Sequence, residues 1–365
     1  MTTTSELDVN VPTGPNSLNV NSKQVNNILG EYDLPDETKL GSYIPTLAVH
    51  DGAFHCDDVM AIAMLKVIPR LTDAKIVRSR NFEVLNECDY VMDVGGVYNH
   101  SERRYDHHQR GFNESVSSLD PTKLSTVKLS SAGLIFYHYG LEIIAAVIND
   151  HPNVDKCLVI FDKMYTSFIQ EIDGIDNGIN PYPNISQSPL YTINTGLSKR
   201  ISRMNPTSDD NYDEHFLKAV DYAQKEFVAT VKYYADSWYS TYEIVKFAIN
   251  DRFAIHESGA VLELDIKGNF REHILTVEKD LGIEGQILFV IIEKSDSWRV
   301  SCVPVRLDSF ESRKPLLEEW RGYHNNDLQN ICGIPDAVFV HHSGFCGGCI
   351  SKESTLKMIE MTLNL

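Results

Sequence analysis

The chain has 365 residues, of which 42% are hydrophobic and 23% charged, a composition typical of a globular protein with room for two domains. Its formal net charge of −18 argues against a surface that binds duplex nucleic acid by bulk electrostatics, but not against a local site that contains divalent cations. We find no apolar run of about 18 residues, the length of a membrane span, and no secretory or Arg-rich leader. We therefore expect no membrane association, no secretion and a cytoplasmic or nuclear location, with a mitochondrial pool left open.

The seven cysteines are scattered and odd in number, a pattern typical of reduced thiols and not of a disulfide-bonded secreted domain. Cys346 and Cys349 form a C-x-x-C pair, but no second pair or suitably spaced histidine completes a zinc site. We interpret this pair as coincidental.

The first half of the chain predicts an α/β fold. Residues 1–42 are rich in Ser, Thr, Asn, Asp and Pro and predict a disordered tail. Apolar runs then predict strands at 44–50, 74–79 and 89–96, with a helix at 58–68 after the first. This alternation indicates βαβ units and a parallel sheet, whose ligands bind beyond the carboxyl ends of the strands. We assign this α/β domain to residues 43–205.

The second half predicts a connector and a smaller domain. Two long helices are expected at 130–148 and 154–172, and the glycines of "DGIDNG" should end the second. Apolar residues then recur every three or four positions from Phe216 to Tyr234, which indicates an amphipathic helix in a helical connector, 206–250. Several β-like runs and a closing helix at 351–363 predict a C-terminal α+β domain, 251–365.

Histidines and carboxylates gather where predicted elements end. Mixed imidazole and carboxylate ligands favour Mn, Fe, Zn or Co over Ca, and Asp93, isolated before two glycines, is our candidate for a carboxylate that bridges two ions. Adjacent residues of an extended segment point in opposite directions, so one of His107 and His108 should bind a metal and the other should face a substrate. Each residue alone would suit a structural role, but the clusters together favour a site: His50, His55 and Asp57; Asp93; Asp106, His107 and His108; Asp173 and Asp176.

Four motifs in the order "HDGAFHCDD", "VMDVGG", "YDHHQRGF" and "EIDGIDNG" resemble those of the DHH phosphoesterase superfamily, in the variant of the Myg exonuclease family (melanocyte proliferating gene one type). The resemblance continues through "SSAGLIFYHYG", "NTGLSKRISRMNPT", "WRVSCVPV", "SFESRKPLLEEWRG" and "FVHHSGFCGG", and covers roughly residues 43–365. It implies a DHH-type catalytic domain, a DHH-associated-like domain that binds substrate, and 3′-5′ exonuclease action on single-stranded RNA. The implied cofactors are two divalent ions that generate a hydroxide, Mn²⁺ first, with Mg²⁺, Zn²⁺ and Co²⁺ as alternatives.

Carried over by motif, the resemblance implies that one ion is bound by His50 and His55 and the other by Asp57 and His107, with Asp93 as the bridge. The fourth motif would add a ligand to the first ion, and the sequence does not choose between its two candidates, Asp173 and Asp176.

In the same carry-over, His108 would contact the scissile phosphate. His55 departs from the superfamily, whose other members carry a carboxylate at this place, one residue closer to the first histidine. An imidazole in place of a carboxylate favours softer transition metals over Mg²⁺, so the identity of the native metal is left open. Asp58 stands where the family usually has glutamate, and we expect it to support the helix start.

Glycines in "HHSGFCGGC" are expected just before a helix N-terminus, where backbone N–H groups can hold a phosphate or ribose. This stretch resembles the glycine motif of the DHH-associated domain. The expected substrate-binding residues are Arg110, Arg313, Arg321, His342, Ser343, Gly344, Gly347 and Gly348.

Two alternatives to the RNA exonuclease remain. One is a DHH-type hydrolase of short oligonucleotides or of small phosphoanhydrides such as pyrophosphate; the other is a scaffold with a relic metal site, which the intact ligand set disfavours. The sequence identifies no protein partner, leaves homo-oligomerisation open, and does not separate RNA from DNA as substrate.

Overall fold

The computed structural model describes residues 43–364 apart from 149–152, 183–189, 209–210 and 267–269, so the predicted tail 1–42 lies outside the described residues. The chain divides into two compact units, which within the described part are 43–237 and 238–364. The division falls inside the predicted connector 206–250.

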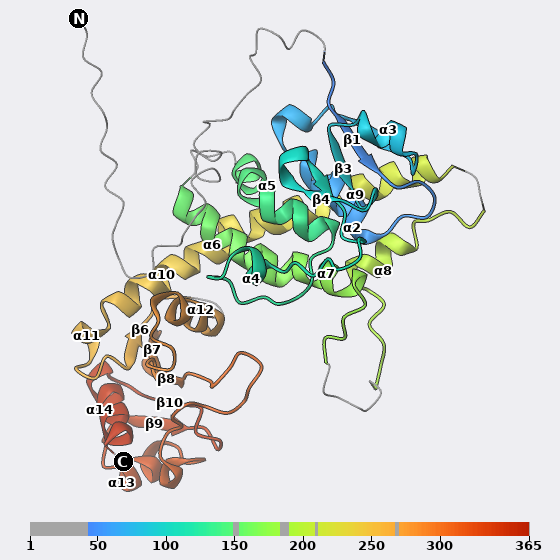
Figure 1. The fold of residues 1–365 in the computed structure, drawn as a ribbon. Coiled ribbons are helices and arrows are strands. Elements are labelled where there is room, and N and C mark those ends of the chain that lie inside the picture. Colours follow the sequence, from blue (N-terminus) through green and yellow to red (C-terminus); the bar gives the residue numbers. More distant parts are fainter. Residues whose placement is uncertain (1–42, 149–152, 183–189, 209–210, 267–269, 365) are drawn as a thin grey trace, which may run out of the picture. The chain divides into compact units, whose positions relative to one another are not determined.

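The first unit contains the strands β1 (Thr46–Val49), β2 (Lys75–Arg78), β3 (Tyr90–Met92), β4 (Tyr98–Asn99) and β5 (Arg104–Tyr105) in one sheet, ordered β2-β1-β3-β5-β4 (Figure 1). Strands β2, β1, β3 and β5 are parallel, and the short edge strand β4 is antiparallel to β5. The predicted parallel sheet and α/β class are therefore confirmed. Because the parallel strands end at one edge, the segments after β1, β3 and β5 meet there.

The same unit contains helices that pack on the sheet and on one another. They are α2 (Cys56–Leu65), α3 (Phe82–Asn86), α4 (Val116–Leu119), α5 (Ser131–Ile148), α6 (Val154–Met164), α7 (Gln170–Asp176), α8 (Leu197–Ser202) and α9 (Tyr212–Tyr233), with the 3-10 turns η2 (Pro69–Leu71) and η3 (His100–Glu102) and the π-helical segment η4 (Tyr165–Ile169). Helix α2 is buried along its whole length and packs against α5 and α9. Apolar residues of these helices form one core with those of β1 and β3.

The expectation that the chain has no apolar run of membrane-span length is wrong. Helix α5 is, by length and composition, apolar enough to cross a membrane, but 67% of that window is buried inside the unit, as expected of a core helix. Segments α6, η4 and α7 follow one another directly, so the helical stretch continues past Gly174 to Asp176. It ends inside "DGIDNG" as predicted, before the second glycine, Gly178, which has a φ of 65°. A single glycine lowers helix propensity by only about 1 kcal/mol, which packing against α5 offsets.

The second unit follows the π-helical segment η5 (Tyr234–Trp238). It contains α10 (Tyr239–Asn250), α11 (Arg252–Ile255), β6 (Val261–Glu263), α12 (Arg271–Leu281), β7 (Phe289–Lys294), β8 (Ser297–Cys302), η6 (Glu318–Trp320), α13 (Asn325–Cys332), β9 (Ala337–Val340), β10 (Cys346–Cys349) and α14 (Lys352–Leu363). Its sheet has the order β6-β7-β8-β10-β9, with β6 parallel to β7 and the other pairs antiparallel (Figure 1). The unit is thus of the predicted α+β type.

The expectation that Gly347 and Gly348 lie in a loop before a helix is wrong. Both lie in β10, between β8 and β9, and α14 begins only at Lys352. A Cβ on Gly348 would lie 2.4 Å from the Trp298 carbonyl oxygen, so glycine is required there by the close approach of β8. The N-terminus of α14 is capped by Ser351, whose hydroxyl accepts a hydrogen bond from the Ser354 N–H.

Packing between α5 and α6 generates a stability prediction. A Cβ on Gly140 of α5 would lie 2.7 Å from the Phe161 ring of α6, so Gly140→Ala should lower the free energy of unfolding by about 1–3 kcal/mol through overpacking. The matched control is Gly174→Ala in α7, where nothing lies within 4 Å of the added Cβ. It should leave stability unchanged or raise it by up to about 1 kcal/mol. Denaturant unfolding measures both, and equal effects would contradict the packing argument.

Candidate metal centre

The loop after β1 brings the first histidine to the sheet edge. His50 is buried, and its Nδ1 lies 2.9 Å from the Asp51 carbonyl oxygen. A carbonyl oxygen only accepts, so Nδ1 carries a proton and Nε2 is the nitrogen that faces the buried carboxylates. This Nε2 lies 3.3 Å from Asp58 Oδ2 and 3.3 Å from Asp93 Oδ2. Burial alone would lower the pKa of His50, but these carboxylates outweigh burial and raise it.

Helix α2 presents two fully buried aspartates in its first turn. Asp58 Oδ1 accepts hydrogen bonds from the N–H groups of His55 and Val59, so Asp58 supports the helix start as predicted. Asp57 lies beside it, and neither of its carboxylate oxygens has a hydrogen-bond partner among the described residues. Burial, followed by the charges of nearby aspartates, raises the pKa of Asp57 well above its usual value, and burial raises that of Asp58 to about 7.

Asp93 follows β3 in a left-handed backbone conformation, with a φ of 59° that is uncommon for a residue other than glycine. Its N–H donates to the Tyr105 carbonyl oxygen at the end of β5. The Ser131 hydroxyl at the start of α5 lies 3.3 Å from Asp93 Oδ1 and 3.0 Å from the same Tyr105 oxygen. Neighbouring strands and α5 together hold the carboxylate at the sheet edge.

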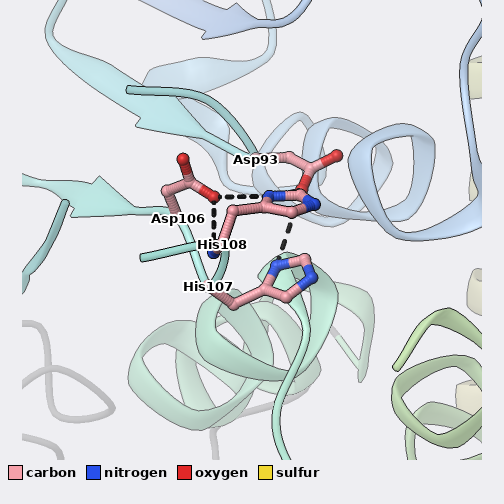
Figure 2. A group of neighbouring side chains, drawn as sticks. All are labelled: Asp93, Asp106, His107 and His108. Carbon is pink, nitrogen blue, oxygen red and sulfur yellow. Dashed lines mark hydrogen bonds and ion pairs between the residues drawn. The ribbon is translucent and has the colours of Figure 1, made fainter. Parts of the chain in front are cut away.

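The prediction that His107 and His108 point in opposite directions is wrong. Strand β5 ends at Tyr105, and beyond it the chain is irregular, so the alternation of a strand no longer applies. Figure 2 shows both rings beside Asp93: its Oδ1 lies 3.5 Å from His107 Nδ1 and 3.4 Å from His108 Nδ1. The two ring centroids are 4.3 Å apart.

Asp106 has a role that the sequence did not reveal. Its Oδ1 lies 2.8 Å from His108 Nδ1 and accepts the His108 N–H (Figure 2). Its Oδ2 accepts the Gly96 N–H at 2.6 Å. Burial alone would raise the pKa of Asp106, but these hydrogen bonds lower it. Mainly through the hydrogen bond to Asp106, the pKa of His108 is raised. His108 remains 61% exposed, so its other nitrogen, Nε2, is accessible.

The structure separates the two candidates of the fourth motif. Asp173 is fully buried, accepts hydrogen bonds from the N–H and hydroxyl of Ser130, and lies 3.3 Å from the Tyr165 hydroxyl. It approaches Gly133 of α5 so closely that an added Cβ would lie 2.3 Å from Oδ1. Asp176 instead lies 2.8 Å from His107 Nε2. Asp173 is thus bound to α5, and Asp176 faces the histidines.

The grouped donor atoms fit a cation. Ligand atoms within 4.8 Å of one another form three overlapping groups, namely His50, His55 and Asp93; His55, Asp57 and Asp176; and Asp93, Asp106, His107 and His108. Buried carboxylate oxygens of Asp57, Asp58 and Asp93 lack hydrogen-bond partners among the described residues. Leaving such atoms unpaired is costly, and a divalent cation would compensate them.

The expected substrate-binding residues belong to both units. In the first unit, Arg110 is exposed. In the second, His342 and Ser343 are exposed beside a turn at Gly344, whereas Arg313 forms a buried ion pair with Glu278 at 2.7 Å. Arg321 Nε donates to the Leu316 carbonyl oxygen and lies against Gly344.

Fold and site together define an α/β protein with a candidate metal centre at the carboxyl edge of a parallel sheet. The family model MYG1_exonuc, described as an uncharacterised protein family (UPF0160), matches residues 46–363, and the chain belongs to this family. The chain is 42% identical over 324 residues to the MYG1 exonuclease of Bos taurus, covering 87% of this chain and 84% of that protein. It is 40% identical over 345 residues to the MYG1 exonuclease of Homo sapiens, covering 92% of this chain and 91% of that protein.

Among solved structures, RecJ of Thermus thermophilus in complex with Mn²⁺ is similar at 13% identity and a TM-score of 0.24, covering 96% of this chain and 56% of RecJ. An overall similarity this low supports no conclusion about the site.

Asp176→Asn should weaken Mn²⁺ binding at least tenfold, or about 1.4 kcal/mol, because it removes a charged donor from the cluster. Asp173→Asn keeps an acceptor for Ser130 and should leave the affinity within about threefold of wild type, or about 0.6 kcal/mol. Isothermal titration calorimetry measures both. The reverse order would identify Asp173 as the ligand.

Proposed function

We propose that this protein is a divalent-metal-dependent phosphodiesterase, a 3′-5′ exonuclease that acts on single-stranded RNA. The observation that carries the proposal is the set of buried carboxylate oxygens of Asp57 and Asp93 that have no hydrogen bond among the described residues, beside the imidazole of His50. Membership of a family whose mammalian members are named exonucleases supports the reaction class.

The residues that would hold the ions are His50, His55, Asp57, Asp93, His107 and Asp176. When bound, a divalent cation supplies Lewis-acid activation of the phosphate and of a water molecule. No nucleophilic side chain is then required, and the protein's contribution is to orient the substrate and balance its charge.

His108 is the candidate for direct contact with the phosphate. Its Nδ1 is held by Asp106, so its exposed Nε2 is the nitrogen that can reach a phosphate oxygen. In this proposal Asp106 orients the ring, and His108 stabilises the negative charge that develops during displacement. Further contacts to the strand are proposed for exposed Arg110, His342 and Ser343.

A second candidate is the hydrolysis of short oligonucleotides or pyrophosphate. The observation that favours it is the engagement of Arg313 with Glu278 and of Arg321 with a backbone carbonyl, which leaves fewer basic groups for a long strand.

An assay with end-labelled single-stranded RNA and DNA, with and without Mn²⁺, Mg²⁺ and a chelator, tests the proposal. We expect 3′-labelled RNA to release a labelled mononucleotide at once and 5′-labelled RNA to shorten stepwise, with both activities lost on chelation and in Asp93→Asn. The matched control is Asp221→Asn, an exposed aspartate paired with Lys225. Cleavage that survives chelation refutes metal dependence, and faster turnover of dinucleotides or pyrophosphate favours the second candidate.

His108→Ala should lower kcat by about 10²–10³, or roughly 3–4 kcal/mol in the barrier, since one donor to the developing charge is removed. Mn²⁺ affinity should stay within a few fold of wild type, because His108 Nδ1 is already engaged by Asp106 and His108 is not one of the proposed metal ligands. Half-buried His256 in the second unit, far along the chain from the proposed metal ligands, provides the control variant His256→Ala. Near-wild-type turnover by His108→Ala would refute this role.

A further inference from the structure

The loop that carries His55 is held by a side chain 151 residues away. Asn205 lies just beyond α8 in the stretch "RMNPT". The Phe54 N–H donates to Asn205 Oδ1 at 2.9 Å, and Asn205 Nδ2 donates to the Phe54 carbonyl oxygen at 2.8 Å. One amide side chain therefore satisfies both backbone groups of Phe54, as a neighbouring strand would do.

The ring of Phe54 is fixed as well. It is 1% exposed and packs edge-on against Phe216 of α9, with ring centroids 5.6 Å apart. The Arg78 guanidinium lies 4.6 Å from the Phe216 centroid and donates to the Gly52 carbonyl oxygen at 2.6 Å. Both the side chain and the backbone of Phe54 are thus immobilised immediately before His55.

The peptide plane that joins Phe54 to His55 is held at both ends. Asn205 binds its carbonyl oxygen, and Asp58 Oδ1 accepts its N–H at 2.9 Å. Because a peptide group is planar, two such bonds fix the plane that ends at the His55 Cα, and helix α2, for which His55 is the N-cap, restrains the other side of this Cα. Together they limit the directions in which the His55 side chain can leave the backbone. The orientation of His55 matters because this residue is exposed and yet belongs to two of the three groups of potential metal ligands.

We propose that Asn205 is a positioning residue for His55, which it holds in place for metal binding before the ion arrives. The inference rests on the proposed metal-dependent function. An exposed imidazole on a loose loop would lose conformational entropy when it binds an ion. The hydrogen bonds of Asn205 order the loop during folding, so this entropy cost no longer opposes metal binding. Partners one step removed from a metal typically affect its affinity by about 10–100-fold.

Calorimetric titration of the purified full-length chain with Mn²⁺ tests this role without reference to activity. Asn205→Ala should weaken Mn²⁺ binding by about tenfold or more. The control is Asn153→Ala, which removes the N-cap of α6. Asn153 lies at the start of the continuous helical stretch α6-η4-α7, whereas Asp176 lies at its end. Asn153→Ala should reduce thermal stability and leave the affinity unchanged.

A double-mutant cycle decides whether Asn205 acts through His55. In the His55→Ala background, Asn205→Ala should cause no further loss of Mn²⁺ affinity. An equal loss in both backgrounds, or wild-type affinity in Asn205→Ala, overturns the inference while leaving the metal centre intact. Absence of Mn²⁺ binding by the wild-type chain refutes the proposed function and this inference together.

Asn205→Asp is a second variant that keeps the acceptor for the Phe54 N–H and loses the donor to the Phe54 carbonyl oxygen, together with a longer hydrogen bond of 3.3 Å to the Ser202 carbonyl oxygen. The added negative charge would by itself favour a cation, so weaker Mn²⁺ binding must come from the lost hydrogen bonds. We expect Asn205→Asp to bind Mn²⁺ more weakly than wild type. This variant therefore tests the inference even if Asn205→Ala does not fold. Unchanged or tighter binding by Asn205→Asp would overturn the role.

Discussion

The free-energy cost of burying several carboxylates at one edge of the first unit's sheet is the main constraint on the candidate metal centre. Asp57, Asp58 and Asp93 are almost completely buried, and Asp176 lies beside them. Burying a carboxylate without a partner costs several kcal/mol, and like charges nearby add to that cost. The imidazoles of His50 and His107 offset part of this cost, and a cation bound by the oxygens of Asp57 and Asp93 that lack hydrogen bonds would offset the rest.

The backbone is arranged to tolerate this concentration of charge. Strands β1, β3 and β5 are parallel, so their carboxyl ends, where His50, Asp93 and His107 follow, share an edge. Helix α2 begins at the same edge and places two carboxylates in its first turn, where the helix dipole favours negative charge. Asp93 adopts a left-handed conformation that is rare outside glycine, a strain that the hydrogen bond to Tyr105 helps to maintain.

The sequence predicted those parts that depend on local pattern. Apolar strands that alternate with helices indicated the parallel sheet, and polar residues after each strand marked the edge where they meet. It did not predict the orientation of His107 and His108, because that depends on where β5 ends. It could not choose between Asp173 and Asp176, which lie on one short helix and differ only in the side that each presents to α5. The roles of Asp106 and Asn205 depend on partners placed by the tertiary fold, and the glycines of β10 matched a helix-start motif as well as a strand.

The number of hydrogen bonds that each polar side chain already makes within the protein separates the residues that face the candidate metal centre from those that support it. Asp173 and Asp106 each have both carboxylate oxygens engaged by protein groups, and the Asn205 amide is engaged at both of its atoms. Asp57 has neither oxygen engaged and Asp93 has one open. A side chain whose donors and acceptors are all matched by the protein gains nothing further from a cation, whereas an unmatched buried oxygen gains a great deal. The same residue types, aspartate above all, therefore serve both purposes within one small region, and what decides the purpose is how many partners the fold has already given them.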